Sequence, residues 1–164
     1  MLKETADCMI LVVEDNPADL TLVREALKEH QIDCTLHVTN DGAKAIAFLS
    51  SLDTDSKAPR LDLVLLDMHL PKRDGADILK SLRATERYGQ TPVIVMTASD
   101  APEDYEKAEK NAALSYFRKP SSLAEFMKLG ALVKSVLSGS NEQRIWGNEP
   151  KRVNGETKNA GAPK

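Results

Sequence analysis

The sequence predicts a doubly wound α/β fold built on a five-stranded parallel sheet. Short apolar runs alternate with segments of helical periodicity, and the order strand then helix repeats five times. Most of the runs are continuously apolar, which is typical of strands buried on both faces of a parallel sheet. The composition is globular, with 41% hydrophobic and 29% charged residues, and 164 residues suffice for one domain with short extensions.

Five segments are predicted to be strands. Four are short runs rich in aliphatic residues and bounded by polar or turn residues, and the second is a weaker alternating segment. In chain order they are Met9–Val13, Cys34–Val38, Leu63–Leu66, Val93–Met96 and Leu114–Phe117. All are far too short to span a bilayer.

A helical segment follows each predicted strand. The helices are expected to begin near Asn16, Asp41, Gly75, Glu103 and Ser122. Asn16 precedes a proline at the first helical position, and Ser122 opens a capping box with Glu125. The last helix is expected to run without a break to Leu137. The polar connection Ser50–Leu61 is expected to be a mobile loop.

The chain is expected to divide into an N-terminal extension over 1–8, a folded domain over 9–138 and a flexible tail over 139–164, which contains Trp146. The net charge of −3 argues against a nucleic-acid-binding surface, and no apolar signal segment precedes the first strand. Cys8 and Cys34 show neither metal-ligand spacing nor a disulfide framework. A soluble protein of the reducing cytoplasm, without a membrane partner, is therefore expected.

Polar side chains follow four of the strands at their carboxyl ends. Glu14 and Asp15 follow the first strand, and Asp67 follows the third. Thr97 and Lys119 follow the fourth and fifth strands. In a sheet of order 2-1-3-4-5, ligands bind where the strand order reverses, between strands one and three. We therefore expect the three carboxylates to converge there, with Thr97 and Lys119 beside them.

Three carboxylates at one point repel one another unless a cation neutralises them. Oxygen ligands suit magnesium or manganese, and magnesium commonly combines one or two carboxylates with water and phosphate oxygens. A metal beside a hydroxyl and an ammonium group indicates phosphoryl chemistry, in which positioning and charge neutralisation do most of the work. Asp67 is then a candidate nucleophile, because carboxylates can form aspartyl-phosphates.

These residues stand in motifs that resemble the response-regulator receiver domain, the phosphoacceptor of two-component signalling. The motifs are Val13-Glu14-Asp15-Asn16, Leu66-Asp67-Met68-His69-Leu70-Pro71 with Asp74-Gly75, Met96-Thr97-Ala98, and Lys119-Pro120. The likeness runs from about Met9 to Leu137. It implies the flavodoxin-like form of the fold, with strand order 2-1-3-4-5 and helices on both faces.

The resemblance also implies roles for the metal and acceptor residues. Asp67 would accept a phosphoryl group from the phosphohistidine of a sensor histidine kinase or a histidine phosphotransfer protein. Asp15 and Asp67 would bind Mg²⁺ directly, with Mn²⁺ as an alternative. Glu14 would contribute through water, and the backbone carbonyl of His69 would be a further ligand. Lys119 would pair with Asp67 or with the phosphoryl oxygens.

The remaining implied roles concern switching and tuning. Thr97 would turn its hydroxyl to the phosphoryl group, and Tyr116 would then swing inward, which changes the surface of the fourth helix, fifth strand and fifth helix. His69 and Ser99 stand where side chains tune autodephosphorylation, and histidine is not typical there. The resemblance also makes the peptide bond before Pro120 a candidate for the cis form.

On this interpretation the protein is a single-domain switch rather than an enzyme, and it signals by protein contact or phosphorelay. The segments Asn16–Asp19 and Leu70–Gly75 are similar to those of stand-alone receivers that partner bacterial phytochrome kinases. Direct nucleic-acid binding is not expected, and both a monomer and a homodimer are compatible with the resemblance.

Three alternatives stay open. A metal-dependent phosphohydrolase would share the nucleophile, metal and lysine, but such enzymes commonly carry a second aspartate where this chain has His69. A degenerate receiver would act only as a binding scaffold. A flavin-binding protein would need a phosphate-cradling loop after the first strand, where Glu14 and Asp15 would repel phosphate.

Overall fold

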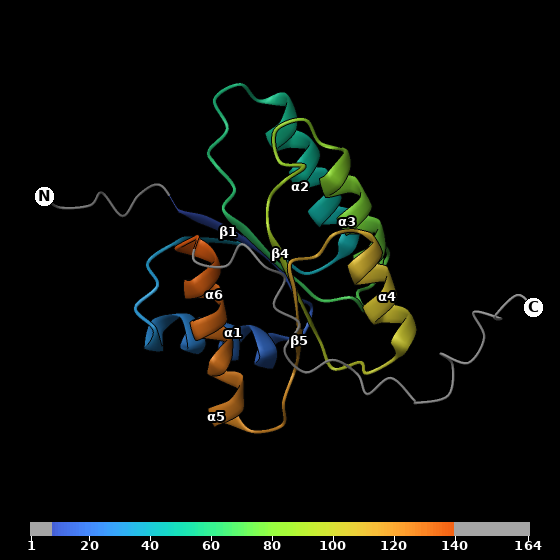
Figure 1. Ribbon diagram of the computed structural model, residues 1–164. Coiled ribbons are helices and arrows are strands. Elements are labelled where there is room, and N and C mark those ends of the chain that lie inside the picture. The colour runs from blue at the N-terminus through green and yellow to red at the C-terminus, as the bar shows by residue number, and fades with distance from the viewer. Residues whose placement is uncertain (1–7, 140–164) are drawn as a thin grey trace, which may run out of the picture.

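The predicted fold class and strand order are confirmed. The computed structural model describes residues 8–139. A parallel sheet of order β2-β1-β3-β4-β5 lies between two layers of helices (Figure 1). The strands are β1 (Met9–Val13), β2 (Thr35–Thr39), β3 (Leu63–Leu66), β4 (Val93–Thr97) and β5 (Ser115–Arg118). The helices are α1 (Pro17–Glu29), α2 (Gly42–Thr54), α3 (Gly75–Ala84), α4 (Pro102–Lys110), α5 (Leu123–Phe126) and α6 (Lys128–Leu137).

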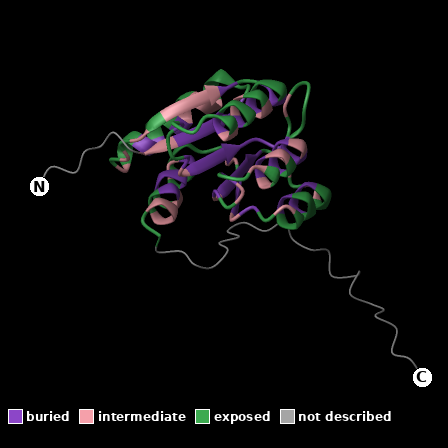
Figure 2. Ribbon diagram, turned by 90° about the horizontal axis from the view of Figure 1, so that it is seen from above, coloured by how far each residue is buried: buried purple, intermediate pink, exposed green. Residues whose placement is uncertain are grey.

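The sheet separates two hydrophobic cores. Because side chains alternate along a strand, Ile10 and Val12 pack among side chains of α1, α5 and α6, whereas Leu11 and Val13 pack among those of α2, α3 and α4. All four are fully buried, and Figure 2 shows the buried strands inside helices whose outer faces are exposed. This two-sided burial explains why β1 is continuously apolar in the sequence.

Local side-chain caps form four of the predicted helix starts, those of α1, α2, α3 and α5. The side chains of Asn16, Asp41 and Ser122 each accept a hydrogen bond from a backbone N–H in the first turn of α1, α2 and α5. Asp74 caps α3 in the same way. These caps place the helix N-termini at the end of the sheet where the strands finish.

Two helix predictions need correction. The last helix is not continuous, because it divides at Met127 into α5 and α6. There Gly130 N donates to Met127 O at 3.0 Å, a bond between residues three apart, whereas an α-helix joins residues four apart. The connection Ser50–Leu61 is not one loop, because α2 continues to Thr54. Beyond it, Arg87 donates to two of the segment's backbone carbonyls and holds it in place.

The two cysteines also depart from expectation, because Cys8 and Cys34 form a disulfide. The register of the sheet explains the pairing. Met9 pairs with Thr35 in the β1–β2 ladder, and Thr35 N donates to Cys8 O at 2.8 Å. The cysteines therefore face each other one residue before the ladder, although 26 positions separate them in sequence.

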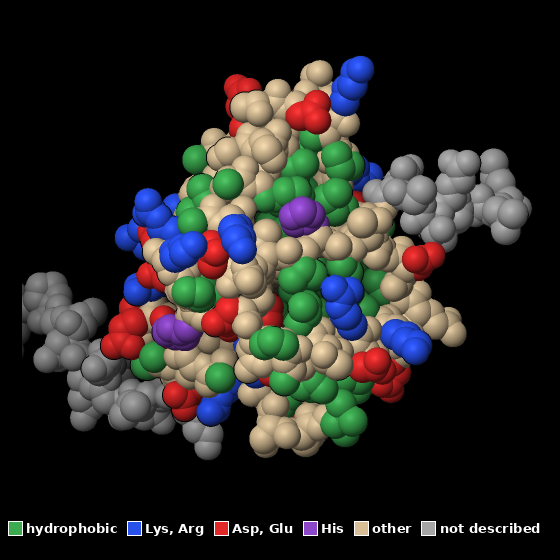
Figure 3. All heavy atoms as spheres, turned by 180° about the vertical axis from the view of Figure 1, so that it is seen from behind, with side chains coloured by type: hydrophobic (Ala, Val, Ile, Leu, Met, Phe, Trp, Pro, Cys, Tyr) green, Lys and Arg blue, Asp and Glu red, His purple; other side chains and the backbone are tan. Residues whose placement is uncertain are grey.

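On the face shown in Figure 3, basic and acidic side chains are interspersed rather than segregated. Across residues 8–139, no helix combines the length and apolarity that crossing a membrane requires. Residues 1–7 and 140–164, which make up nearly all of the expected extension and tail and include Trp146, lie outside the described residues.

Candidate functional site

The carboxyl ends of the strands bring the predicted residues together through hydrogen bonds that extend the ladders. Asp67 N donates to Val13 O at 3.0 Å, directly after β3 and beside the end of β1. Lys119 N donates to Thr97 O at 2.8 Å, directly after β5 and beside the end of β4. The backbone therefore fixes the origin of each side chain at one edge of the sheet.

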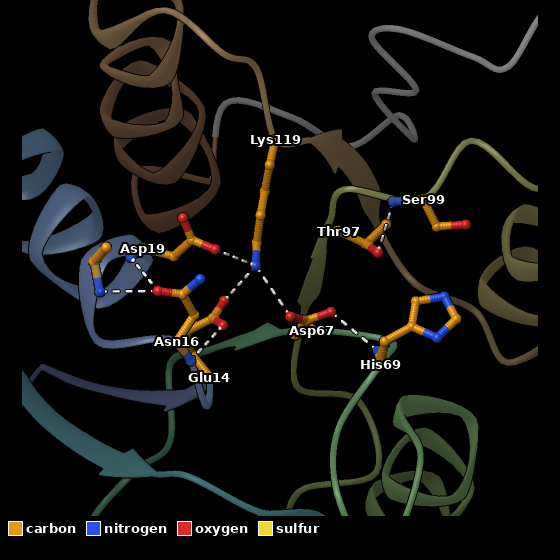
Figure 4. Close-up of polar contacts among 9 residues, drawn as sticks. Glu14, Asn16, Asp19, Asp67, His69, Thr97, Ser99 and Lys119 are labelled. Atoms are coloured by element: carbon orange, nitrogen blue, oxygen red, sulfur yellow. Dashed lines mark hydrogen bonds and ion pairs between the residues drawn. The ribbon is translucent and has the colours of Figure 1, made fainter.

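Lys119 is the centre of the polar contacts. Its Nζ lies 2.7 Å from Glu14 Oε2, 2.9 Å from Asp19 Oδ2 and 3.0 Å from Asp67 Oδ2 (Figure 4). Only 8% of the lysine side chain is exposed. Burial would lower the pKa of Lys119, but its hydrogen bonds to Glu14 and Asp19 outweigh burial and raise the pKa. The site therefore contains one ammonium group shared by three carboxylates.

Glu14 is the most buried of these acids, at 2% exposure. Burial raises its pKa, and the hydrogen bond and charge of Lys119 oppose that effect. Oε1 of Glu14 accepts a hydrogen bond from Asn16 N at 3.1 Å, and Oε2 faces Lys119. Both oxygens thus have partners, which allows a carboxylate to be buried here.

The three acids predicted to hold a metal do converge. Carboxylate oxygens of Glu14, Asp15 and Asp67 lie within 4.8 Å of one another. Glu14 and Asp67 are buried and Asp15 is exposed, so the cluster opens to solvent on one side. An all-carboxylate donor set that keeps room for water fits a hard divalent cation such as Mg²⁺ or Mn²⁺. That the His69 carbonyl is a further ligand stays a prediction.

The two residues predicted to act in switching, Thr97 and Tyr116, are buried near Ser99. Thr97 is fully buried, and its hydroxyl accepts a hydrogen bond from Ser99 N at 3.2 Å. The Tyr116 ring is 1% exposed, and its hydroxyl donates to Ser99 O at 3.0 Å. Burial, followed by the charge of Asp104, raises the pKa of Tyr116 to about 12. Tyr116 thus already occupies the inward position that was expected only after phosphorylation, because Ser99 O gives its hydroxyl a partner there.

A carboxylate of α4 joins the two predicted tuning residues. Asp104 Oδ2 lies 2.6 Å from His69 Nε2 and 2.5 Å from Ser99 Oγ. Burial would raise the pKa of Asp104, but the hydrogen bonds from Ser99 and His69 outweigh burial and lower the pKa. His69 also donates its backbone N–H to Asp67 Oδ1 at 3.0 Å. The His69 imidazole is therefore turned toward α4.

The expected cis bond is wrong: no peptide bond between residues 8 and 139 is cis, so Pro120 follows a trans bond. Trans is the more stable form before proline by about 0.5–1 kcal/mol, and packing must supply more than that to reverse it.

One glycine is required by the loop after Asp67. A Cβ at Gly75 would lie 2.7 Å from Met68 Cα and 2.8 Å from Asp67 O. Gly75 N also donates to Met68 O at 3.0 Å. The start of α3 therefore packs directly against the backbone that carries the candidate acceptor.

Sequence reasoning did not assign two of the residues in these contacts. Asp19 lies in the first turn of α1, where an acidic residue is explained by the helix dipole alone, so its position carried no functional signal. Asp104 is 35 positions from His69, and no spacing rule connects them. Both contacts depend on how helices dock at the edge of the sheet.

Comparison with known proteins identifies the class. The family model for the response regulator receiver domain matches residues 10–130. The chain therefore belongs to the response regulator receiver family, whose members are signalling switches of two-component systems.

Among its relatives, the chain is 36% identical to the response regulator Rcp1 of Synechocystis over 74% of this chain and 82% of Rcp1. It is 32% identical to the probable methanogenesis regulatory protein FilR2 of Methanothrix harundinacea, over 81% of this chain and 85% of FilR2. The crystal structure of the phosphorylated cyanobacterial phytochrome response regulator RcpA matches with a TM-score of 0.72 and 28% identity, over 81% of this chain and 95% of RcpA. That of Mn²⁺-bound Rcp1 matches with a TM-score of 0.68 and 35% identity, over 77% of this chain and 91% of that chain.

Proposed function

We propose that this protein is a phosphorylation-dependent switch in which Asp67 accepts a phosphoryl group from a histidine kinase or a histidine phosphotransfer protein. The observation that carries the proposal is the position of Asp67 at the centre of the site. It lies 3.0 Å from the Lys119 ammonium and within 4.8 Å of the carboxylates of Glu14 and Asp15. An oxygen nucleophile between a fixed cation and a cation-binding cluster suits phosphoryl transfer.

In the transfer step, a carboxylate oxygen of Asp67 forms a bond to phosphorus as the phosphorus–nitrogen bond of the donor histidine breaks. The histidine leaves with the electron pair and takes a proton from solvent. Lys119 balances the negative charge that the phosphoryl oxygens bring to the site. Asp15, Asp67 and the His69 carbonyl would hold Mg²⁺, with Glu14 nearby. When bound, this ion would supply further neutralisation of charge.

We propose that Thr97 carries the signal outward. Its hydroxyl accepts the hydrogen bond of Ser99 N at 3.2 Å, and a turn toward the new phosphoryl oxygens would weaken that bond. Ser99 also accepts the Tyr116 hydroxyl through its carbonyl. A shift of Ser99 would therefore move the β4–α4 loop, and with it the surface of α4, β5, α5 and α6, which we propose as the signalling surface.

The proposed partner is a sensor histidine kinase of the phytochrome type. The likeness to Rcp1 and to the phytochrome response regulator RcpA supports this choice. We propose that residues 9–138 form the receiver unit. The test compares the rates of phosphotransfer from a phytochrome-type kinase and from an unrelated histidine kinase, at equal concentrations of the phosphorylated kinases. We expect transfer from the phytochrome-type kinase to be faster.

The three alternatives receive less support. A phosphohydrolase would need an acid/base group at position 69, but the His69 imidazole is engaged by Asp104. A scaffold that has lost its chemistry would not need Lys119 held between carboxylates. A flavin phosphate would meet the negative charges of Glu14 and Asp15 after β1.

The decisive experiment is intact-mass measurement after incubation with acetyl phosphate and Mg²⁺. We expect a single phosphoryl adduct on the wild type. The adduct should not form when a chelator is present during the incubation, and it should not form on Asp67→Asn. The matched control is Asp100→Asn, an exposed aspartate after β4, which should form the adduct normally. An adduct that persists in Asp67→Asn, or no adduct in the folded wild type, would contradict the proposal.

A further inference from the structure

Helix α4 contacts the end of the sheet that carries Asp67 through one buried carboxylate. Asp104 Oδ2 accepts hydrogen bonds from His69 Nε2 and Ser99 Oγ, and we call these three residues the Asp104 bridge. The Asp104 side chain is only 11% exposed, whereas the His69 side chain is 63% exposed. An ionised carboxylate can only accept, so it is satisfied by donors that come from two different loops.

One end of the Asp104 bridge contacts the acceptor residue Asp67, and the other end contacts Thr97. His69 N donates to Asp67 Oδ1 at 3.0 Å, and Ser99 N donates to Thr97 Oγ1 at 3.2 Å. Ser99 Oγ also accepts a hydrogen bond from Ala101 N at 3.1 Å, which steadies the start of α4. His69 and Ser99 lie on the side of Asp67 away from Asp19 and Glu14 (Figure 4). Asp104 therefore joins the loops after β3 and β4 on that side.

We propose that Asp104 is a positioning residue that holds His69 and Ser99 together as a cover beside Asp67 and so prolongs the life of its phosphoryl group. This inference rests on the proposed function. It adds a residue from α4 that no sequence motif identifies, and it makes the lifetime depend on how α4 is docked.

The chemical reason is the path of the attacking water. In hydrolysis, a water oxygen bonds to phosphorus while the bond between phosphorus and the Asp67 oxygen breaks. The carboxylate is regenerated, inorganic phosphate leaves, and the proton of the water passes to the phosphate or to solvent. Attack and departure are roughly in line, so water must approach from the side opposite the leaving oxygen. A bridge that holds both loops closed restricts this approach, and its loss opens it.

The experiment follows the decay of the phosphoryl adduct by intact mass after acetyl phosphate is removed. Asp104→Ala should shorten the lifetime by about three- to tenfold, the range that one or two hydrogen bonds can account for. Asp104→Asn keeps an acceptor oxygen and should fall between Asp104→Ala and wild type. The matched control is Glu106→Gln, an exposed acid on the same helix, which should leave the lifetime unchanged. An unchanged or longer lifetime in Asp104→Ala would overturn the inference.

Two further measurements separate positioning from a merely structural role. In the double variant His69→Ala/Ser99→Ala, adding Asp104→Ala should produce no further shortening, since Asp104 acts through those side chains. An additive effect would refute that route.

Hydrogen–deuterium exchange of the unphosphorylated protein tests the bridge without any phosphoryl chemistry. Residues 98–104 should exchange faster in Asp104→Ala than in wild type. If wild type forms no adduct, the proposed function fails and the lifetime claim fails with it. If the adduct forms normally but neither lifetime nor exchange changes in Asp104→Ala, only the present inference fails.

Discussion

Reduction of the Cys8–Cys34 disulfide should lower the stability of the domain substantially. The bond closes a loop of 26 residues between the start of β1 and the start of β2. In the chain-entropy model, opening a loop of that length gives conformational entropy back to the unfolded chain. The free energy of unfolding then falls by about 3.5 kcal/mol at 25 °C. For a domain of about 130 residues, this corresponds to a fall in melting temperature of about 12 °C.

The assay is thermal unfolding followed by circular dichroism, with and without a phosphine reductant. Thiol titration in denaturant establishes the starting state: no reactive thiol is expected before reduction and two are expected after it. The matched control is the double variant Cys8→Ser/Cys34→Ser, which should melt near the reduced wild type and should not respond to reductant.

Two results would refute the reasoning. Two reactive thiols in protein purified without reductant would show that the bond does not form. A shift below about 2 °C in protein whose thiols are fully oxidised would show that loop entropy is not the source of stability at this site.

Three other changes test the site. Lys119→Met should destabilise the protein by about 3–5 kcal/mol at pH 7 in urea unfolding, because the buried Glu14 carboxylate loses its counter-charge. Adding Mg²⁺ should restore part of the lost free energy of unfolding. An unchanged urea midpoint in the variant would contradict the role of Lys119 as the shared counter-charge. The pKa of Tyr116 is raised to about 12 in the folded protein, whereas the pKa of an unfolded tyrosine is near 10. The contribution of Tyr116 to stability should therefore fall as pH rises from about 10 and level off above about 12. Thermal melts across that range should lack this contribution in Tyr116→Phe, and identical pH profiles in the two proteins would disprove the prediction. Gly75→Ala should cost about 1–3 kcal/mol in urea unfolding because its Cβ would meet Met68 Cα at 2.7 Å, and a neutral result would show that the loop yields easily.

Much of the fold was predictable because its signals are local. Continuous apolar runs identified β1, β3 and β4, and the caps at Asn16, Asp41 and Ser122 marked the helix starts. The break at Met127 was not predictable, because the helical periodicity continues through it. What changes there is the backbone hydrogen bonding of Gly130, which packs closely against α1.

The candidate site was predictable in its members but not in its contacts. Parallel strands end at one edge, so residues that follow β1, β3, β4 and β5 must lie near one another once the strand order is known. Which carboxylates pair with Lys119 depends on side-chain reach and on the docking of α1, which brings Asp19 to 2.9 Å from the ammonium.

The sequence by itself determined the order of elements, the buried strands, the helix caps and the group of acids around Asp67, because each depends on nearest neighbours or on the direction in which strands end. The tertiary structure alone decided the Cys8–Cys34 pairing, the inward position of Tyr116 and the Asp104 bridge. These depend on strand register and helix docking, which bring together residues far apart in the chain, and short-range patterns carry no information about such distances.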